Sequence, residues 1–219
     1  MQLSEQEVIR RENLQKILDA GVNPYPAEQF IKNTTSEEIK QNFDKEENNF
    51  QEVVIAGRLM QKRIMGKASF AELMDSHGRI QIYVNRDEIC PGEDKTLYNT
   101  VFKKLLDIGD FIGVKGHAFF TQTGTLSIHV KELTVLSKAL RPLPVVKTDA
   151  EGNVHDAFTD PEQRYRMRYV DLVVNPEIKE VFRKRSRIIS AMRRFFDDKG
   201  WLEVETPVLQ TIHGGAAAR

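Results

Sequence analysis

The chain has 219 residues, a length that fits one large domain or two ordinary ones. Apolar residues make up 40% of it and charged residues 29%, a composition that argues against a disordered chain. Its 32 Lys and Arg residues balance its 32 Asp and Glu residues, which argues against a protein coated throughout with positive charge but leaves room for a local basic surface.

Two helices are predicted in residues 1–50, which we interpret as an N-terminal helical extension. Ser4 and Glu7 form the pattern of a capping box, and apolar residues follow at roughly helical spacing. The first helix is therefore expected from about residue 5 to about residue 20. A similar capping pattern starts at Thr35 and predicts a second, shorter helix.

Residues 51–137 contain five short runs of alternating or β-branched residues, which predict five strands. In chain order the runs are VVIAGRLMQKR, ASFAELMD, RIQIYVN, DFIGVKGHAFF and LSIHVKELTVL. Between the third and fourth runs, apolar residues four apart predict a helix that stops near Gly109. Three strands, a helix and two strands within about 85 residues is the element order of an OB-fold, a five-stranded barrel that often binds single-stranded nucleic acid. The pattern alone leaves an unspecified small β-barrel equally open.

Residues 138–175 are interpreted as a linker and connecting loop, because Pro142 and Pro144 favour an extended chain and residues 147–165 are polar. A long helix is predicted from Pro176 to Gly200. The run WLEVETPVL then alternates apolar and acidic residues, as a half-buried strand does. One helix and one strand do not close a core, so we interpret residues 176–219 as the opening of a second domain. The expected fold class is α+β.

The common sequence signatures of phosphate binding and hydrolysis are absent, including GxxxxGK[ST], GxGxxG, GxSxG and HExxH. The histidines are scattered singly, so we expect no metal site. Cys90 is the single cysteine, which rules out an intrachain disulfide and a zinc site built on paired cysteines. The N-terminal run MQLSEQEVIRR lacks the apolar stretch of a signal peptide, and no segment approaches ~20 consecutive apolar residues. We therefore expect a cytoplasmic protein without a membrane span.

Basic side chains gather near one predicted turn of the barrel, at Gly66. They are Arg58, Lys62, Arg63 and Lys67. Cations of this kind can follow the phosphates of a single-stranded nucleic acid, and a guanidinium can also read base edges. We interpret this region as a candidate nucleic-acid surface.

Phe70 lies in the second predicted strand, close to these cations. It shares a strand face with Glu72 and Met74, and the charge on that face predicts that the face is partly in water. An exposed ring can stack on a base, whereas composition alone would place this phenylalanine in a core. The third strand adds Gln81 and Tyr83, an amide and a second ring.

Several runs of the sequence resemble the class II lysyl-tRNA synthetases. They are RIMGKASFAELMD, RIQIYV, LSKALRPLP, RYRMRYVDL and VETPVLQTIHGGAAAR, and they extend in order from about residue 52 to the end. The resemblance implies a lysine–tRNA ligase that activates L-lysine with ATP and Mg2+ and transfers it to the 3′ end of tRNA(Lys). It also implies a homodimer, a barrel that binds the tRNA anticodon and a larger antiparallel α/β catalytic domain, of which residues 176–219 are the start.

The resemblance implies roles for single residues of the barrel. Phe70 matches the aromatic residue that stacks on the central anticodon uridine, and Arg63 and Gln81 match side chains that read anticodon bases. Lys67 is a candidate phosphate contact. Thr125 stands in a TGTLS run where the family is expected to carry an acidic reader, and it completes the anticodon-binding set.

The last part of the chain resembles motif 1, the dimer-forming motif of class II synthetases. The resemblance assigns the dimer interface to Ile188, Met192, Phe196 and Pro207, and the edge of the lysine pocket to Gly214 and Gly215; His213 replaces an expected proline in that loop.

Motifs 2 and 3 of the class II synthetases do not occur in the sequence, so we assign the sequence no catalytic or metal-binding residue. We expect the chain alone to be catalytically incomplete and to self-associate weakly or aberrantly. The rival interpretation is a stand-alone, non-catalytic OB-fold module that binds tRNA.

Overall fold

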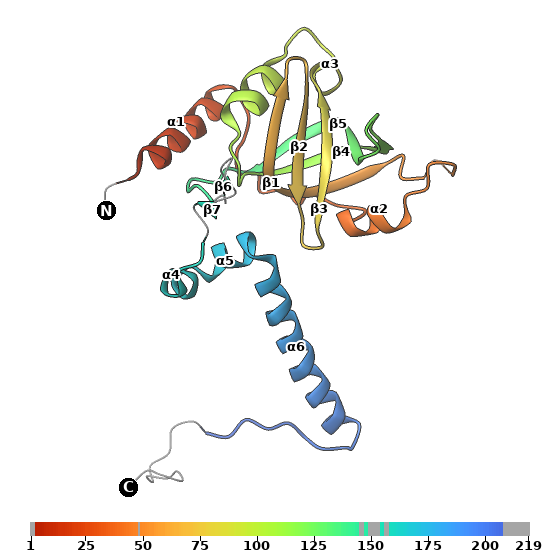
Figure 1. Cartoon of the computed structure of the whole chain (residues 1–219), viewed down its shortest axis with the longest axis vertical. Helices are drawn as coiled ribbons and strands as arrows, with labels where there is room; N and C mark the ends of the chain where they lie inside the picture. The colour runs from red at the N-terminus through yellow and green to blue at the C-terminus, as the bar shows by residue number, and fades with distance from the viewer. Residues whose placement is uncertain (1–2, 48, 145–146, 149–153, 156–157, 208–219) are drawn as a thin grey trace. The chain divides into compact units, whose positions relative to one another are not determined.

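The computed structural model describes residues 3–47, 49–144, 147–148, 154–155 and 158–207. The chain divides into two compact units, Met1–Leu143 and Pro144–Arg219. The first unit contains the barrel and the helices that cover it (Figure 1). The second contains short helices and one long helix. Within the described ranges, no helix has both the length and the apolar character needed to cross a membrane.

A closed five-stranded barrel forms the body of the first unit. Its strands are β1 (Val53–Met65), β2 (Ala68–Met74), β3 (Arg79–Asn85), β4 (Phe111–Phe120) and β5 (Leu126–Ser137). They pair in the order β1-β2-β3-β5-β4, and β3 and β5 are parallel while the other pairs are antiparallel. The five predicted strands and the predicted OB-fold are therefore confirmed.

The alternation of side chains along each strand separates the core from the outer surface. In β2, Ala71 and Leu73 are buried inside the barrel, whereas Phe70, Glu72 and Met74 are half-buried on the outer face. The prediction that Phe70 shares a partly wet face with Glu72 is thus confirmed. The interior is filled by branched aliphatic residues: Val53, Ile55, Leu59, Ile80, Ile82, Val84, Ile112, Val114, Ile128 and Val130.

Two predicted helices are present near the N-terminus: α1 (Glu5–Asp19) and α2 (Ser36–Asn42). The Ser4 capping box forms as predicted, because its hydroxyl accepts from the Glu7 N–H while the Glu7 carboxylate accepts from the Ser4 N–H. The start of α2 is fastened to the turn between β2 and β3, since Asp75 accepts hydrogen bonds from both the N–H and the hydroxyl of Ser36, at 2.7 Å each.

The helix predicted between the third and fourth strands differs from expectation in type and length. It is a π-helix, η1 (Leu97–Leu105), that ends four residues before Gly109. Its end is fixed by Lys62 of β1, whose ammonium donates to the carbonyl oxygens of Phe102, Lys103 and Leu106 at 2.9, 3.3 and 2.6 Å. These carbonyl oxygens lie at the C-terminal end of η1, where the helix dipole makes a positive charge favourable. A four-residue helix, α3 (Arg86–Ile89), follows β3 and was not predicted.

The segment that leaves β5 is bound to the barrel by a buried ion pair. The Lys138 ammonium contacts Asp110 at 3.0 Å and Asp107 at 2.6 Å, and the side chains of Lys138 and Asp110 are completely buried. Burial raises the pKa of the Asp110 carboxyl, and the positive charge of Lys138 opposes that rise. Arg10 of α1 adds hydrogen bonds to the carbonyl oxygens of Ile108 and Ala139.

The second unit is more regular than predicted at its start. Residues 147–165 were expected to be loop, but β6 (Lys147–Thr148) pairs with β7 (Val154–His155), and α4 (Pro161–Arg166) begins at the proline. Proline at the first helical position and the Asp160 side-chain cap together favour this start. The next helix, α5 (Arg168–Val174), holds a buried Asp171 that pairs with Arg164 and Arg168.

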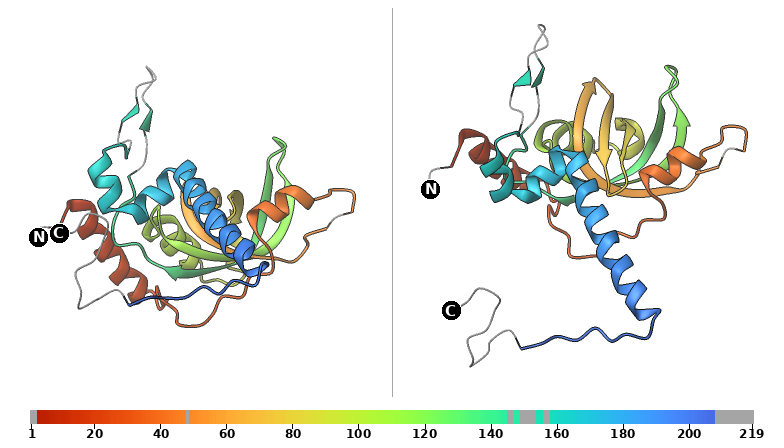
Figure 2. Two further views of the ribbon diagram at one scale, coloured as in Figure 1. Left: turned by 90° about the horizontal axis from the view of Figure 1, so that it is seen from below. Right: turned by 60° about the horizontal axis from the view of Figure 1, so that its bottom comes forward.

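The long helix predicted from Pro176 is confirmed as α6 (Pro176–Asp197), a single uninterrupted helix in both views of Figure 2. The strand predicted after it is wrong for the residues that the structure describes. Residues 201–207 have no regular structure, and the side chains of Leu202 and Val204 are 89% and 73% exposed. A strand needs neighbouring backbone to pair with, and no described strand pairs with this segment.

Candidate nucleic-acid interface

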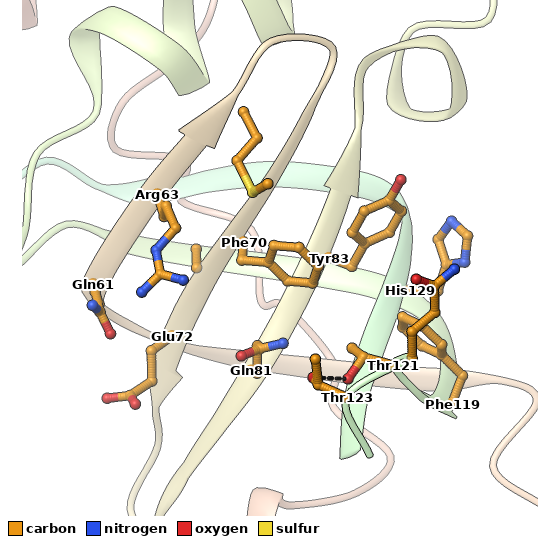
Figure 3. A pocket seen from close by; sticks show the side chains of 13 residues that line it. Gln61, Arg63, Phe70, Glu72, Gln81, Tyr83, Phe119, Thr121, Thr123 and His129 are labelled. Carbon is orange, nitrogen blue, oxygen red and sulfur yellow. Dashed lines mark hydrogen bonds between the residues drawn. The ribbon is translucent and has the colours of Figure 1, made fainter. Parts of the chain in front are cut away.

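A pocket with a volume of about 660 Å³ lies on the outer face of the barrel (Figure 3). One wall comes from β1, β2 and β3, and the other from β4, β5 and the turn between them. The lining residues are Gln61, Arg63, Met65, Phe70, Ala71, Glu72, Gln81, Tyr83, Phe119, Thr121, Gln122, Thr123 and His129. The pocket is large enough for a drug-sized ligand and is rich in rings and amides.

The strand register aligns four of the lining side chains in one row across the barrel. Arg63 of β1 is opposite Phe70 of β2, Phe70 is opposite Tyr83 of β3, and Tyr83 is opposite His129 of β5. The three rings of the row lie against one another, because the Tyr83 ring centroid is 5.2 Å from that of Phe70 and 4.9 Å from that of His129. Figure 3 shows Arg63, Phe70 and Tyr83 side by side on successive strands.

Phe70 lies in the middle of the first wall and is half-buried. Its ring centroid is 5.2 Å from that of Tyr83, with the two planes tilted by 53°. The ring is supported from the side by Tyr83 and lines the pocket. A supported ring at the surface is a suitable platform for a base.

Arg63 and Gln81 supply polar groups on either side of Phe70. Within the described part of the chain, Arg63 makes no hydrogen bond or ion pair, so its guanidinium donors are available to a ligand. The Gln81 amide nitrogen donates to the hydroxyl of buried Ser127 at 3.0 Å, which orients the side chain. The nearby Glu72 is paired with Arg79 at 2.9 Å, and that pair reduces the negative charge beside the pocket.

The structure does not bring Lys67 or Thr125 into the pocket. Lys67 is exposed at the turn after β1, next to Gly66, whose positive φ of 70° closes the turn. Thr125 is exposed in the turn between β4 and β5, where its backbone pairs with Thr121. Thr121 lines the pocket instead. Of the five predicted anticodon-binding residues, Arg63, Phe70 and Gln81 therefore lie together, and the other two lie at separate turns.

Two of the basic residues first grouped around Gly66 have structural partners. Lys62 holds the end of η1, as described above, and Arg58 donates to the carbonyl oxygen of Gly109 at 2.9 Å and lies over the Phe111 ring. Both are therefore parts of the barrel's framework.

The second wall of the pocket was not predicted. It contains Phe119 and His129, with the His129 ring hydrogen-bonded to Glu88 of α3. The period-2 pattern of the fourth and fifth strands is the signal that could have placed these rings on the outer face. Burial and the neighbouring His129 lower the pKa of His117, which lies beside this wall.

The dimer residues implied by the resemblance lie in the second unit. Ile188, Met192 and Phe196 are exposed on α6, and Pro207 is exposed in the irregular segment after it. Gly214 and Gly215 lie outside the described residues. Among the described residues, no group of three or more His, Cys, Asp or Glu side chains is arranged to hold a metal ion.

Comparison with known protein families agrees with this geometry. Residues 53–136 match the family described as "OB-fold nucleic acid binding domain", and residues 160–219 match "tRNA synthetases class II (D, K and N)". The barrel thus has the OB-fold that the matched nucleic-acid-binding family describes, and the sequence after it is similar to the class II tRNA synthetases.

Three curated relatives that the chain matches are lysine–tRNA ligases. The chain is 62% identical to the lysine–tRNA ligase of Christiangramia forsetii and 60% identical to that of Porphyromonas gingivalis, over its whole length in both cases. It is 56% identical over 99% of its length to the lysine–tRNA ligase of Azobacteroides pseudotrichonymphae. The resemblance to class II lysyl-tRNA synthetases is confirmed. The chain spans 38% of the length of the first two relatives and 43% of the third.

Proposed function

We propose that the barrel, residues 51–137, binds the anticodon of tRNA(Lys). The observation that carries the proposal is the convergence of Arg63, Phe70 and Gln81 on one pocket of an OB-fold. Phe70 stacks on the central anticodon base, while Arg63 and Gln81 bind the edges of anticodon bases. Lys67 and Thr125 act outside the pocket, where Lys67 contacts the phosphate backbone and Thr125 helps to hold the turn beside Thr121.

The chemistry of the bases supports this division of roles. A uracil offers a flat face and a few donors and acceptors on its edge, so one ring, one guanidinium and one amide are enough to hold it and to test its identity. Stacking is tolerant of sequence, because every base has a π-face. We therefore assign the discrimination between bases to Arg63 and Gln81.

We further propose that the whole protein is a lysine–tRNA ligase that works in translation in the cytoplasm. In this proposal it activates L-lysine with ATP to lysyl-adenylate and transfers the lysyl group to the 3′ end of tRNA(Lys). Mg2+ would neutralise phosphate charge in that reaction, but no described group of side chains fits a metal, so no step is assigned to these residues. Residues 1–50 form an N-terminal helical extension, 138–175 connect the parts, and 176–219 contribute to the catalytic domain.

The proposal assigns a second role to the exposed apolar residues of α6. Ile188, Met192 and Phe196 are 61%, 58% and 42% exposed, and Trp201 lies against Phe196. In the homodimer these side chains, together with Pro207, form the interface between protomers. Gly214 and Gly215 border the lysine pocket.

The experiment that tests anticodon binding measures the affinity of the chain for two labelled RNA stem-loops by fluorescence anisotropy. One carries the lysine anticodon, and the other differs from it in the central base alone. We expect tighter binding of the lysine stem-loop at every salt concentration, and weaker binding of both as salt rises. Equal affinity for the two stem-loops would contradict the proposal.

A further inference from the structure

The Gln81 side chain is connected to the backbone of the turn before β5 by two consecutive hydrogen bonds. The Ser127 hydroxyl oxygen lies 3.2 Å from the carbonyl oxygen of Thr125, and the Gln81 amide nitrogen lies 3.0 Å from the same hydroxyl oxygen. The parallel pairing of β3 and β5 places Gln81 and Ser127 side by side. Ser127 is completely buried and does not line the pocket, whereas Gln81 does. Any effect of Ser127 on a ligand therefore passes through Gln81.

The number of available hydrogen atoms fixes the direction of both hydrogen bonds. A carbonyl oxygen only accepts, so the Ser127 hydroxyl has to donate its single hydrogen to Thr125. Toward Gln81 the same hydroxyl can then only accept a hydrogen bond. The Gln81 amide is therefore required to turn its NH2 group to Ser127 and its Oε1 atom away from it.

Burial makes the opposite orientation of the Gln81 amide unfavourable. If the amide turned over, its Oε1 atom would face a hydroxyl oxygen that has no hydrogen left to donate, or the bond from Ser127 to Thr125 would break. Because Ser127 is completely buried, water does not replace the lost partner. A buried polar group without a partner costs more than an ordinary hydrogen bond gains, so the amide is held in one orientation.

The locked orientation presents an acceptor to the pocket. None of the described residues donates a hydrogen bond to the Oε1 atom of Gln81, and in Figure 3 this oxygen points to the side of Glu72 while the nitrogen points to the opposite side. The base-pairing edge of uracil has an N–H donor at N3, whereas cytosine has an acceptor at the same atom. An acceptor in this position matches uracil and opposes cytosine.

We infer that Ser127 is a positioning residue that sets the base preference of Gln81: it holds the amide with Oε1 toward the ligand, so that the pocket accepts uracil and rejects cytosine. The contribution of Thr125 is its backbone carbonyl group, which anchors the Ser127 hydroxyl. The inference rests on the proposed anticodon binding. It adds to that proposal the residue that decides which group of Gln81 meets the base.

The test measures the affinities of two stem-loops by fluorescence anisotropy. They carry U or C at the anticodon position where Gln81→Ala removes the base preference. The unmodified chain should favour U by about 5- to 150-fold. In Ser127→Ala the amide is free to turn over and to meet cytosine with its NH2 group, so the C stem-loop should bind about 2- to 12-fold more tightly than it binds the unmodified chain. The U stem-loop should lose at most about 2-fold, because half of the free molecules keep the competent orientation.

Ser69→Ala is the matched control. Ser69 is another completely buried serine, on β2, and its hydroxyl lies 2.7 Å from that of Tyr98, away from Gln81. Its loss should leave the preference for U over C unchanged. The Gln81→Ala/Ser127→Ala double variant should show the same preference as Gln81→Ala alone, because Ser127 acts only through Gln81.

Melting temperatures show whether each variant is folded during the titration. Ser127→Cys provides a second variant of nearly the same size, because a thiol is a weak donor and a weak acceptor. It should relax the preference in the same direction as Ser127→Ala and can be titrated if the alanine variant is unstable.

The outcomes separate the inference from the proposed function. If Gln81→Ala reduces the preference but both Ser127 variants keep it, or weaken the U and C stem-loops equally, the positioning role is wrong and anticodon binding stands. A relaxed preference in Ser69→Ala would also refute the positioning role, since loss of any buried hydroxyl would then disturb the pocket. If Phe70→Ala and Gln81→Ala leave affinity and base preference unchanged, the proposed function itself is wrong.

Discussion

Arg63 and Phe70 lie directly opposite each other on β1 and β2, so a single cross-strand pair presents a guanidinium and an aromatic ring to the same pocket. A bulge in β1 makes this possible. The register shifts between Leu59 and Gln61, so even-numbered residues face outward before the bulge and odd-numbered residues face outward after it. As a result Arg63 faces the pocket, while its neighbour Lys62 turns to the end of η1.

The first prediction concerns Phe70. Replacing it by alanine should weaken binding of a lysine anticodon stem-loop by about 1 to 3 kcal/mol, or about 5- to 150-fold, because one stacked base loses its platform. Since the ring is only half-buried on the outer face, the melting temperature should change little. Anisotropy titration and thermal melting of the same sample measure both effects.

Phe102→Ala provides the contrasting control, because Phe102 is completely buried against the barrel. Truncation of a core phenylalanine costs about 3 to 5 kcal/mol of stability. A Phe70→Ala protein that behaves like Phe102→Ala, with a large fall in melting temperature and unchanged affinity for the folded fraction, would show that Phe70 serves the core.

A second prediction separates base reading from stacking. Gln81→Ala should reduce the preference for the correct base at one anticodon position by about 1 to 3 kcal/mol, because a base-edge contact carries sequence information. The affinities of stem-loops with each of the four bases at that position give the preference. A uniform loss across all four would assign Gln81 a general contact and no reading role.

Lys67 should behave differently, because it is exposed at a turn outside the pocket. Lys67→Ala is expected to weaken all stem-loops alike and to reduce the slope of log affinity against log salt by about 1. Titrations at several salt concentrations measure that slope. An unchanged slope would mean that Lys67 contacts no phosphate.

The first wall of the pocket could be predicted from sequence because it depends on local alternation. Phe70, Glu72 and Met74 share a face in any regular strand, and the charge on Glu72 identifies the wet side. Side-chain alternation could not show that Lys62 and Arg63 have different roles. Their directions depend on a bulge, and a one-residue shift exchanges the two faces of a strand.

The second wall depends on contacts far apart in sequence. His129 meets Tyr83 because β3 pairs with β5 in parallel, and it meets Glu88 across 41 residues of chain. The alternation of side chains within a single strand does not reveal these contacts. The strand predicted for residues 201–207 was wrong although its local pattern is that of a strand. Alternation of side chains does not supply a neighbouring strand for the backbone hydrogen bonds.

A further prediction uses the Asp75 carboxyl, which joins α2 to the turn after β2. Burial would raise its pKa, but hydrogen bonds from Ser36, His77 and Gly78 outweigh burial and hold the pKa below its ordinary value. A lowered folded pKa gives stability that is present above the unfolded pKa and is lost as pH falls through the folded pKa. Asp75→Ala should therefore cost at least about 1.5 kcal/mol at pH 7, and less at pH 3. Urea unfolding at both values measures the difference, and a constant cost would exclude a charge effect.

The last prediction concerns the buried pair of Lys138 and Asp110. Lys138→Ala leaves the Asp110 carboxylate without its ammonium partner in a fully buried site, so we expect a loss of about 3 to 5 kcal/mol of stability at pH 7. Burial already raises the Asp110 pKa, and removal of the ammonium raises it further, so the unfolded state is favoured increasingly as pH rises through that pKa. The loss of stability should therefore be smaller at acidic pH, and adding Asp110→Asn to Lys138→Ala should recover part of the lost stability at pH 7.

The control is Lys115→Ala, which breaks an exposed pair with Glu132 and should cost at most about 1 kcal/mol. Similar losses for the two lysine variants in chemical unfolding would contradict the structural role of the buried pair.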